Sequence, residues 1–251
     1  MYNIVLNTPE VIVIDDFLPE EIQDRILNQV QVDKWQSTLV DDKFWHMTDG
    51  VNYKGPKRWY SDAPFNDNYD LWFDNLSKFL DTAKNINHVV PGIEDGIFDI
   101  ALRCHAYPVG SKNPWHFDLG FSTYTYYLHK NWQANWDSTL LVLPEGSVDF
   151  EQVLPLKEGT VHYDSYADLE SPMEMFEQSD KFKSIIDKGF GTFVSPKPNR
   201  LVLIKAGVVH GINRVDSDAG DNIRVSLTGA IAEKSYATRL PRFANMERPR
   251  K

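Results

Sequence analysis

The chain has 251 residues, of which 42% are hydrophobic and 25% are charged, a composition that excludes the disordered and fibrous classes of protein. Its length suits one β-rich domain with additions or two small domains, and we favour a single domain over residues 1–251. The formal net charge of -10 disfavours nucleic acid as a substrate, because affinity for a phosphate backbone depends on positive patches.

Residues 1–97 are expected to form a strand and helices that pack against the outside of a core. The run VIVI at 11–14 is typical of a buried strand, and the run at 19–30 is typical of a helix opened by a proline. A second helix is expected from about Tyr69 to Ala83, because the apolar residues there fall on one helical face. The aromatic, turn-rich stretch 45–65 is interpreted as a surface loop over the core that could contact a substrate.

From residue 98 onward the sequence changes to short β-type runs separated by Gly, Pro, Asn and Asp, a pattern typical of a sandwich or barrel. We therefore expect a mainly β fold with flanking helices and a jelly-roll (double-stranded β-helix) core over 98–232. The segment at about 144–198 is interpreted as an insertion with a helix near 180–188, and residues 233–251 as a C-terminal tail. The β-type runs are FDIALRCHAY, FSTYTYYL, STLLVL, GTVHY, NRLVLIKAG, VVHGI and NIRVSLTGAIA.

Three features predict a cytoplasmic protein that does not associate with membranes. No apolar stretch approaches the length of a transmembrane helix. The amino terminus lacks the basic region of a secretory signal. Cys104 is the single cysteine, so no intrachain disulfide can form, and the reducing cytosol is the expected setting.

The motif NPWHFD at 113–118 places His116 and Asp118 two residues apart. In a strand, residues i and i+2 lie on the same face, so both side chains could bind one metal ion. A lone His-x-Asp arises often by chance, so the motif needs support from elsewhere in the chain.

His210, in the run RLVLIKAGVVHGI, supplies a candidate third ligand about 90 residues downstream. Two imidazoles and one carboxylate are the ligand set of oxygen-activating ferrous iron, whereas structural zinc sites usually contain cysteines. Arg224, on the following long run, could grip a carboxylate with two parallel hydrogen bonds. The alternative for Arg224 is a rim arginine paired with one of the many acids, and the alternative distal ligand is His162 in GTVHY.

Together these residues resemble the 2-oxoglutarate and Fe(II)-dependent dioxygenase superfamily, and the match is closest to its prolyl 4-hydroxylase-like branch. RCHAYPVGSKNPWHFD at 103–118 is similar to that branch's strand ending in Tyr, a Pro/Gly turn and His-x-Asp. YTYYLHKNWQANWDSTLLVL at 124–143 is similar to its Tyr-Leu strand, Trp-bearing loop and next strand. The resemblance covers about residues 98–232. Many members carry Gly-Gly where this chain has Asp137 and Ser138.

The resemblance implies the site and the reaction. His116, Asp118 and His210 would hold Fe(II), Tyr107 and Tyr127 would line a 2-oxoglutarate pocket, and Arg224 would bind the far carboxylate. O2 would be the oxidant source, with ascorbate as a stimulant. The expected reaction is hydroxylation of an unactivated C–H bond, with release of succinate and CO2. The first expected substrate is a prolyl residue in a peptide or protein, and the second is a free amino acid or another small molecule.

Period-two alternation places Arg103, His105 and Tyr107 on one strand face, and we expect this polar face to point into the pocket. Arg103 and His105 are therefore candidate substrate residues, and Ser226 shares the face of Arg224 as a candidate cosubstrate contact. Lys57, Arg58 and Arg103 could anchor an acidic group of the substrate, although solvated surface charge is the alternative for the first two.

Two other classes of function fit parts of the same pattern. Seven tryptophans would suit a non-catalytic β-sandwich that binds peptide or sugar. A cupin-like metalloenzyme would use three histidines and no 2-oxoglutarate. Consumption of 2-oxoglutarate separates both from the dioxygenase.

Overall fold

The computed structural model describes residues 2–38, 49–83, 85–90, 98–118, 122–147 and 189–233. The helical elements in these ranges are α1 (Glu20–Val32), η2 (Tyr60–Asp62), α3 (Tyr69–Thr82), η4 (Ala134–Trp136) and η6 (Ser217–Ala219). The strands are β1 (Asn3–Asn7), β2 (Val11–Asp15), β3 (Gln36–Ser37), β4 (Tyr53–Trp59), β5 (Phe98–Tyr107), β6 (Asn113–His116), β7 (Ser122–Tyr127), β8 (Leu140–Val142), β9 (Thr192–Val194), β10 (Leu201–Ile204), β11 (His210–Ile212) and β12 (Arg224–Glu233).

The described strands form two antiparallel sheets whose neighbours are mostly distant in sequence. The major sheet has eight strands in the order β1-β2-β10-β7-β12-β5-β4-β3, and the minor sheet has four in the order β6-β11-β8-β9. Thus β7 lies between β10 and β12, and β11 lies between β6 and β8. This interleaving is characteristic of a jelly roll (double-stranded β-helix), and the jelly-roll core expected from the sequence is confirmed.

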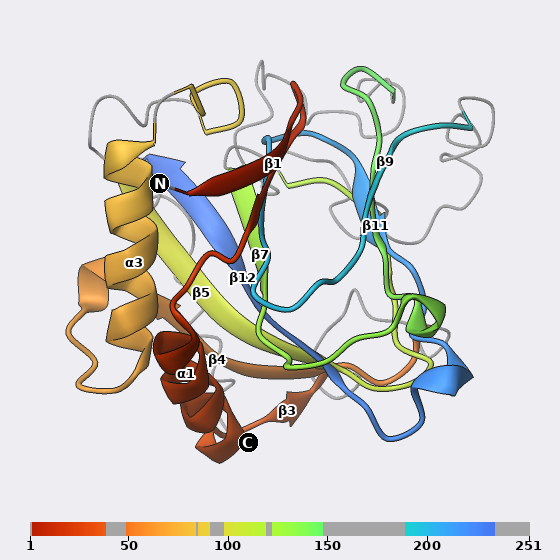
Figure 1. The fold of residues 1–251 in the computed structure, drawn as a ribbon, viewed down its shortest axis with the longest axis horizontal. Coiled ribbons are helices and arrows are strands. Elements are labelled where there is room, and N and C mark those ends of the chain that lie inside the picture. Colours follow the sequence, from red (N-terminus) through yellow and green to blue (C-terminus); the bar gives the residue numbers. More distant parts are fainter. Residues whose placement is uncertain are drawn as a thin grey trace, which may run out of the picture.

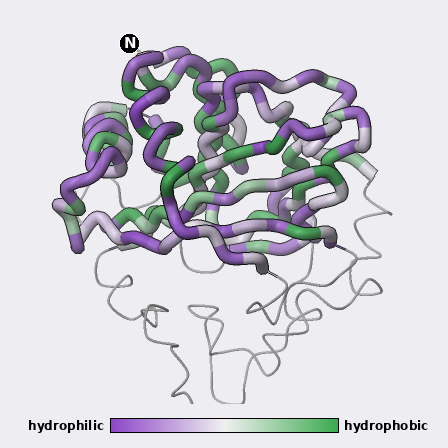
Figure 2. Tube along the Cα trace, turned by 90° about the horizontal axis from the view of Figure 1, so that it is seen from below, coloured by the Kyte–Doolittle hydropathy of each residue, from purple (hydrophilic) through white to green (hydrophobic). Residues whose placement is uncertain are grey.

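The two faces of the major sheet pack against different partners (Figure 1). Helices α1 and α3 cover the outer face, where Ile26, Trp72 and Phe79 join Leu102 and Leu227 in one buried cluster. The inner face is turned toward the minor sheet, which adds its own apolar residues to a second cluster. Figure 2 shows hydrophobic segments running through the layered strands, while many of the connecting turns are hydrophilic.

Several elements agree closely with the sequence analysis. The run at 98–107 coincides with β5, and both expected helices end within two residues of α1 and α3. Alternation or helical periodicity was strong in all three. The helix expected near 180–188 lies outside the described residues, as do His162 and the tail beyond residue 233.

The interpretation of residues 45–65 as a surface loop is wrong for its central part. Tyr53–Trp59 forms β4, which pairs with β5 and with the two-residue β3. A register shift between Lys54 and Lys57 accommodates the intervening Gly-Pro pair. Proline and glycine normally argue against a strand, but both are tolerated near a sheet edge and at a bulge.

A hydrogen-bonded chain ties α3 to the major sheet. The Trp72 indole Nε1 donates to the Tyr124 hydroxyl (3.1 Å), which donates to the Ala101 carbonyl oxygen (2.7 Å). Gly229 lies on the intervening strand β12, and a Cβ there would overlap the Ala101 carbonyl oxygen. The absence of a side chain at this position therefore leaves room for tyrosine to reach across β12.

None of the described helices combines the length and the apolar character that crossing a bilayer would require.

Candidate metal centre and its pocket

The three predicted metal ligands lie together at one end of the minor sheet. His116 ends β6 and His210 begins β11, and the two residues are direct cross-strand partners. Asp118 follows His116 by two residues, and its backbone carbonyl accepts a hydrogen bond from Gly207 N (2.8 Å). The antiparallel register therefore brings together residues that are about 90 positions apart in the chain.

The ligand atoms of His116, Asp118 and His210 all lie within 4.8 Å of one another. His210 Nε2 is 3.5 Å from an oxygen of Asp118, and the two imidazole centroids are 4.2 Å apart. One cation at the centre could contact all three side chains, since metal–ligand bonds to nitrogen and oxygen are about 2.0–2.2 Å long.

Backbone carbonyls fix the tautomer of both imidazoles. His116 Nδ1 donates to the Pro114 carbonyl oxygen (2.8 Å), and His210 Nδ1 donates to the Val208 carbonyl oxygen (2.9 Å). A carbonyl can only accept, so each Nδ1 carries the proton and each Nε2 presents a lone pair. Such hydrogen bonds to the outer ring nitrogen orient histidine ligands in metal sites.

Electrostatics also favour a neutral imidazole at the buried ligand. Burial lowers the pKa of His210, and the neighbouring His116 lowers it further, whereas the Asp118 carboxylate opposes the shift. A metal ligand must be unprotonated, so His210 is prepared to bind a cation at neutral pH.

The donor set fits a divalent transition metal. Two imidazole nitrogens and one carboxylate oxygen occupy one face of an octahedron and leave the other positions open, which is the arrangement typical of non-haem Fe(II) sites. Asn113 was not among the predicted site residues, and its amide nitrogen lies 3.4 Å from His116 Nε2. Its position three residues before His116 was visible in NPWHFD, but nothing in the sequence indicated this contact.

The inner face of the major sheet contains a buried cation, Arg224, without a hydrogen-bond partner among the described residues. Arg224 is 0% exposed, and none of its three guanidinium nitrogens bonds to a described residue. The Tyr127 hydroxyl and the Ser226 Oγ are likewise buried and without a partner there. Buried polar groups are almost always hydrogen-bonded, so three such residues together indicate a site for a polar ligand.

Strand register explains why these groups converge. Arg224 pairs with Tyr107 across β12 and β5, and Ser226 pairs with Tyr127 across β12 and β7. The guanidinium carbon lies 4.7 Å from the Tyr107 ring centroid and 5.0 Å from that of Tyr127. Burial raises the pKa of both tyrosines although Arg224 opposes the shift, so both phenols keep their protons. No described carboxylate forms an ion pair with Arg224, which removes the rim-arginine alternative within that part of the chain.

The other candidate residues divide between the two faces of the sheet. Arg103 and His105 lie on the same face as Tyr107, and His105 Nδ1 is 3.5 Å from the Asn52 amide nitrogen. Arg58 lies on the opposite face, where it pairs with Asp67 (2.9 Å). Arg58 is therefore not part of the pocket, because strand alternation in β4 turns it away from Lys57.

The residues that replace the Gly-Gly pair keep a glycine-like backbone. Asp137 has φ of 51° and Ser138 has φ of 62°, both in the left-handed region. The Asp137 carboxylate accepts a hydrogen bond from the Thr139 backbone N–H (3.0 Å), a local contact that helps Asp adopt this conformation. Both positions thus hold a positive φ without glycine.

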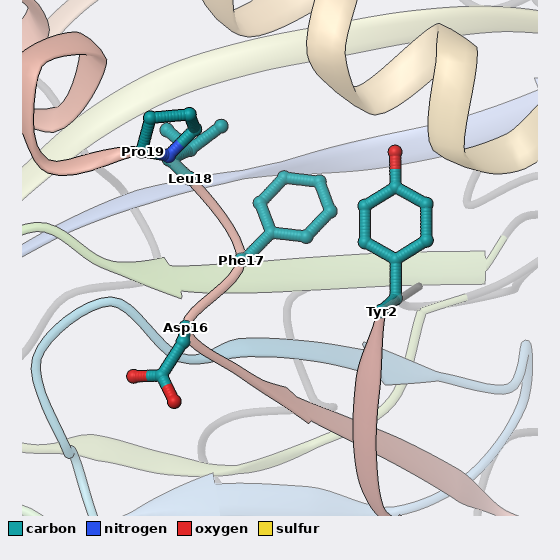
Figure 3. A pocket seen from close by; sticks show the side chains of 5 residues that line it. All are labelled: Tyr2, Asp16, Phe17, Leu18 and Pro19. Atoms are coloured by element: carbon teal, nitrogen blue, oxygen red, sulfur yellow. The ribbon is translucent and has the colours of Figure 1, made fainter.

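A separate hollow of about 350 Å³ lies on another part of the molecule, and none of the predicted site residues lines it (Figure 3). The rings of Tyr2 and Phe17 stack beside it at a centroid distance of 5.8 Å, and the Asp16 side chain points away from them. It offers no metal-ligand set, because Asp16 is the one carboxylate among its lining residues and no histidine or cysteine lines it. The hollow is lined by Tyr2, Asp16, Phe17, Leu18 and Pro19.

The chain was compared with protein-family models, curated sequences and solved structures. No protein-family model and no curated protein sequence matches the chain. Among solved structures, a prolyl-4-hydroxylase from Pseudomonas putida has a TM-score of 0.53 at 15% identity, covering 89% of this chain and 92% of that one. A prolyl hydroxylase from Trichoplax adhaerens, in complex with a hypoxia inducible factor peptide fragment, has a TM-score of 0.54 at 14% identity, covering 94% and 89%.

A third similar structure is HygX from Streptomyces hygroscopicus, solved with nickel, 2-oxoglutarate and hygromycin B. Its TM-score is 0.51 at 12% identity, and the match covers 89% of this chain and 82% of that one. At such low identities the three likenesses establish a shared fold. The chain has the jelly-roll fold of 2-oxoglutarate oxygenases.

Proposed function

We propose that this chain is an Fe(II)- and 2-oxoglutarate-dependent oxygenase that hydroxylates an unactivated C–H bond, with release of succinate and CO2. The observation that supports this function best is one pairing of sites in the jelly roll. A His-Asp-His cluster suited to ferrous iron accompanies a buried Arg224 guanidinium whose three nitrogens have no hydrogen-bond partner among the described residues.

2-Oxoglutarate carries carboxylates, which are the hydrogen-bond acceptors that the groups around Arg224 need. A carboxylate can accept two parallel hydrogen bonds from a guanidinium, and further bonds from the Tyr127 and Ser226 hydroxyls would satisfy the other partnerless groups. Leaving a charged group buried and unbonded is costly, so the Arg224 guanidinium favours binding of an anion. His116, Asp118 and His210 would hold the iron.

When bound, iron with 2-oxoglutarate and O2 supplies the oxidising power for C–H cleavage. The protein's own residues would position the metal and the cosubstrate and shield them from water. The Pro114 and Val208 carbonyls keep both Nε2 atoms available to the metal, Arg224 orients the cosubstrate tail, and the buried rings of Tyr107 and Tyr127 exclude water from the pocket floor.

Proline in a peptide is the first substrate class to test. Two proteins with the same fold are prolyl hydroxylases, one of them in complex with a peptide. HygX has the same fold and was solved with hygromycin B bound, so small molecules are the second substrate class to test. Rim loops rather than the shared scaffold decide specificity in such folds, so both classes belong in the same assay.

Succinate release tests the proposal. Purified protein would be incubated with Fe(II), 2-oxoglutarate, O2 and ascorbate against a panel of proline peptides, free amino acids and small acids. We expect succinate from the native protein and none from His116→Ala. Full succinate production by His116→Ala would contradict the assignment. A binding module would consume no 2-oxoglutarate, and a cupin-like enzyme would turn over its substrate without it.

A further inference from the structure

Asn52 places a buried hydrogen-bond acceptor beside the Arg224 pocket. It is 1% exposed, and its Oδ1 has no hydrogen-bond partner among the described residues. The next residue, Tyr53, pairs with Ala106 across β4 and β5. One further step of the same register sets Asn52 opposite Tyr107, which is the cross-strand partner of Arg224. Directly opposed residues share a face of the sheet, so Asn52 lies on the inner face with them.

Two neighbours on β5 fix the orientation of the Asn52 amide. Its Nδ2 lies 3.5 Å from His105 Nδ1, and an amide nitrogen can only donate, so this ring nitrogen is the acceptor. Burial is the main cause that lowers the pKa of His105 to about 3, so the imidazole is neutral at neutral pH and keeps this lone pair. A hydrogen bond from Asn52 also opposes the rise in the pKa of Tyr107 that burial causes. With Nδ2 turned toward β5, Oδ1 is the end of the amide that is left for a ligand.

The main chain of this segment is held in place on two sides. The backbone N–H and the hydroxyl of Thr38 both donate to the Asn52 carbonyl oxygen, at 2.9 and 3.0 Å. Gly50 has φ of 74° and lies so close to the Gly110 carbonyl that a Cβ would overlap it. The turn that contains Gly110 leads into β6, which ends at His116. The position of Asn52 is therefore tied to the strand that carries a metal ligand.

The Asn52 oxygen requires a ligand group different from those of 2-oxoglutarate. The Arg224 guanidinium and the hydroxyls of Tyr127 and Ser226 can donate hydrogen bonds to a carboxylate. An amide oxygen can only accept, and the 2-oxoglutarate dianion has no N–H or O–H to offer it. Leaving a buried acceptor unbonded costs free energy, so Asn52 indicates a second group that donates. Burial and the charge of Arg224 disfavour protonation of His105, and they would disfavour an ammonium group in the same way.

We propose that Asn52 recognises a neutral amide N–H of the substrate by accepting a hydrogen bond at Oδ1, and that His105 is a positioning residue that keeps this oxygen turned toward the substrate. The inference rests on the proposed function and specifies its substrate class, namely a peptide or another compound with an N–H amide.

A matched pair of probes tests this role by binding alone. N-acetyl-L-proline methylamide and N-acetyl-L-proline methyl ester have nearly the same shape, but only the amide has an N–H. Each would be titrated by calorimetry into anaerobic protein loaded with Fe(II) and 2-oxoglutarate. We expect the native protein to bind the amide roughly tenfold or more tightly than the ester, because the ester leaves the buried Oδ1 unbonded. Equal affinities, or no binding of either probe, would overturn the proposal.

Three substitutions test whether the preference belongs to Asn52. Asn52→Leu has a similar shape but no acceptor, so the ratio of amide affinity to ester affinity should fall to about one. Asn52→Asp keeps an acceptor at the same place and should retain a preference for the amide. Asn75→Leu removes an amide from α3, where Nδ2 donates to the Leu71 carbonyl oxygen (2.7 Å), and should keep the native ratio. An unchanged ratio in Asn52→Leu, or a lost ratio in Asn75→Leu, would contradict the assignment.

His105→Leu tests the positioning role, because it removes the acceptor that holds the Asn52 Nδ2. We expect this variant to bind the amide more weakly with little change in its affinity for the ester. A purely structural role would lower the Tm and weaken the binding of both probes alike. Equal losses for the two probes, or a native ratio, would overturn the positioning role of His105.

Turnover distinguishes failure of this inference from failure of the proposed function. Succinate release would be measured for both probes and for the substrate panel at saturating 2-oxoglutarate. We expect a lower KM for the amide than for the ester with the native protein, and a raised KM for the amide with little change in kcat in Asn52→Leu. Equal KM values with normal succinate release would overturn only the role of Asn52. Absence of 2-oxoglutarate consumption with every substrate, with the binding preference for the amide intact, would instead overturn the proposed function.

Discussion

Both faces of the major sheet are buried, yet their polar side chains differ in whether they have hydrogen-bond partners. On the outer face, the Tyr124 and Tyr126 hydroxyls, the Trp72 indole and the Ser122 hydroxyl all have hydrogen-bond partners. On the inner face, the Arg224 guanidinium, Tyr127 hydroxyl and Ser226 hydroxyl have none among the described residues. Burial is similar, so hydrogen bonding is what distinguishes these two sets of residues.

This difference separates residues that stabilise the fold from residues prepared for a ligand. A satisfied polar group contributes to the stability of the free protein, whereas an unsatisfied one costs free energy until a ligand arrives. Substitutions at matched positions on the two faces should therefore have opposite effects on stability and on binding.

The largest difference is expected between Leu227 and Arg224, both 0% exposed on strand β12. Leu227→Ala leaves a cavity in the outer-face core and should lower the unfolding free energy by about 2–5 kcal/mol, with unchanged 2-oxoglutarate affinity. Arg224→Met relieves a buried charge but loses its contacts with two rings, so stability should change by less than about 1 kcal/mol.

Arg224→Met should also weaken 2-oxoglutarate binding by at least about tenfold, since it removes a bidentate carboxylate contact. Urea unfolding and calorimetric titration measure the two quantities. If Arg224→Met unfolded the free protein as severely as Leu227→Ala, Arg224 would be a structural residue rather than a cosubstrate residue.

A smaller contrast is expected between Tyr124 and Tyr127 on strand β7. Tyr124→Phe breaks the hydrogen bonds to Trp72 and to the Ala101 carbonyl and should cost about 1–3 kcal/mol. Tyr127→Phe removes a hydroxyl that has no partner in the described part of the chain and should change stability by less than about 0.5 kcal/mol. Only Tyr127→Phe should reduce 2-oxoglutarate affinity. Equal losses of stability would remove the distinction between the faces.

Ser138 tests whether an unbonded hydroxyl always indicates a ligand. Its side chain is buried and without a described partner, but its backbone φ of 62° is in the left-handed region. We expect Ser138→Gly to stabilise the protein by about 1 kcal/mol, because glycine adopts this conformation without steric cost. Denaturant unfolding would measure the gain, and a loss of stability would contradict this explanation.

The smallest expected effect concerns the pH dependence of stability through Lys57. Its pKa is about 8 in the folded protein against an ordinary value of 10.5. Between these values the unfolded chain binds the proton more strongly, so the contribution of Lys57 to stability rises with pH. When the pH is raised from 7.5 to 9.5, the Tm of the native protein should increase relative to the Tm of Lys57→Met. A pH-independent difference would contradict the lowered pKa.

Local patterns predicted the parts of the molecule that depend on short-range periodicity. The alternation in FDIALRCHAY predicted β5 and the shared face of Arg103, His105 and Tyr107, which the strand register reproduces. The two-residue spacing of His116 and Asp118 indicated that they could meet one ion, and these side chains do lie together with His210.

Other features depend on tertiary pairing and were not readable from local sequence. Strand β6 contains a proline, and all four of its residues are half-buried, so it shows no alternation. Strand β4 contains Gly-Pro and is fixed by its pairing with β5. The unsatisfied state of Arg224 follows from what surrounds it in space, since the sequence alone suggested an acidic partner equally well.

Anaerobic titration of 2-oxoglutarate into the Fe(II)-loaded protein, followed by visible absorption, tests the assignment of both inner-face sites at once. We predict a weak visible band that saturates with the native protein, is absent in Asp118→Ala, and requires higher 2-oxoglutarate in Arg224→Met. No band with the native protein, or an equal band in Asp118→Ala, would contradict the assignment of the metal centre and its pocket.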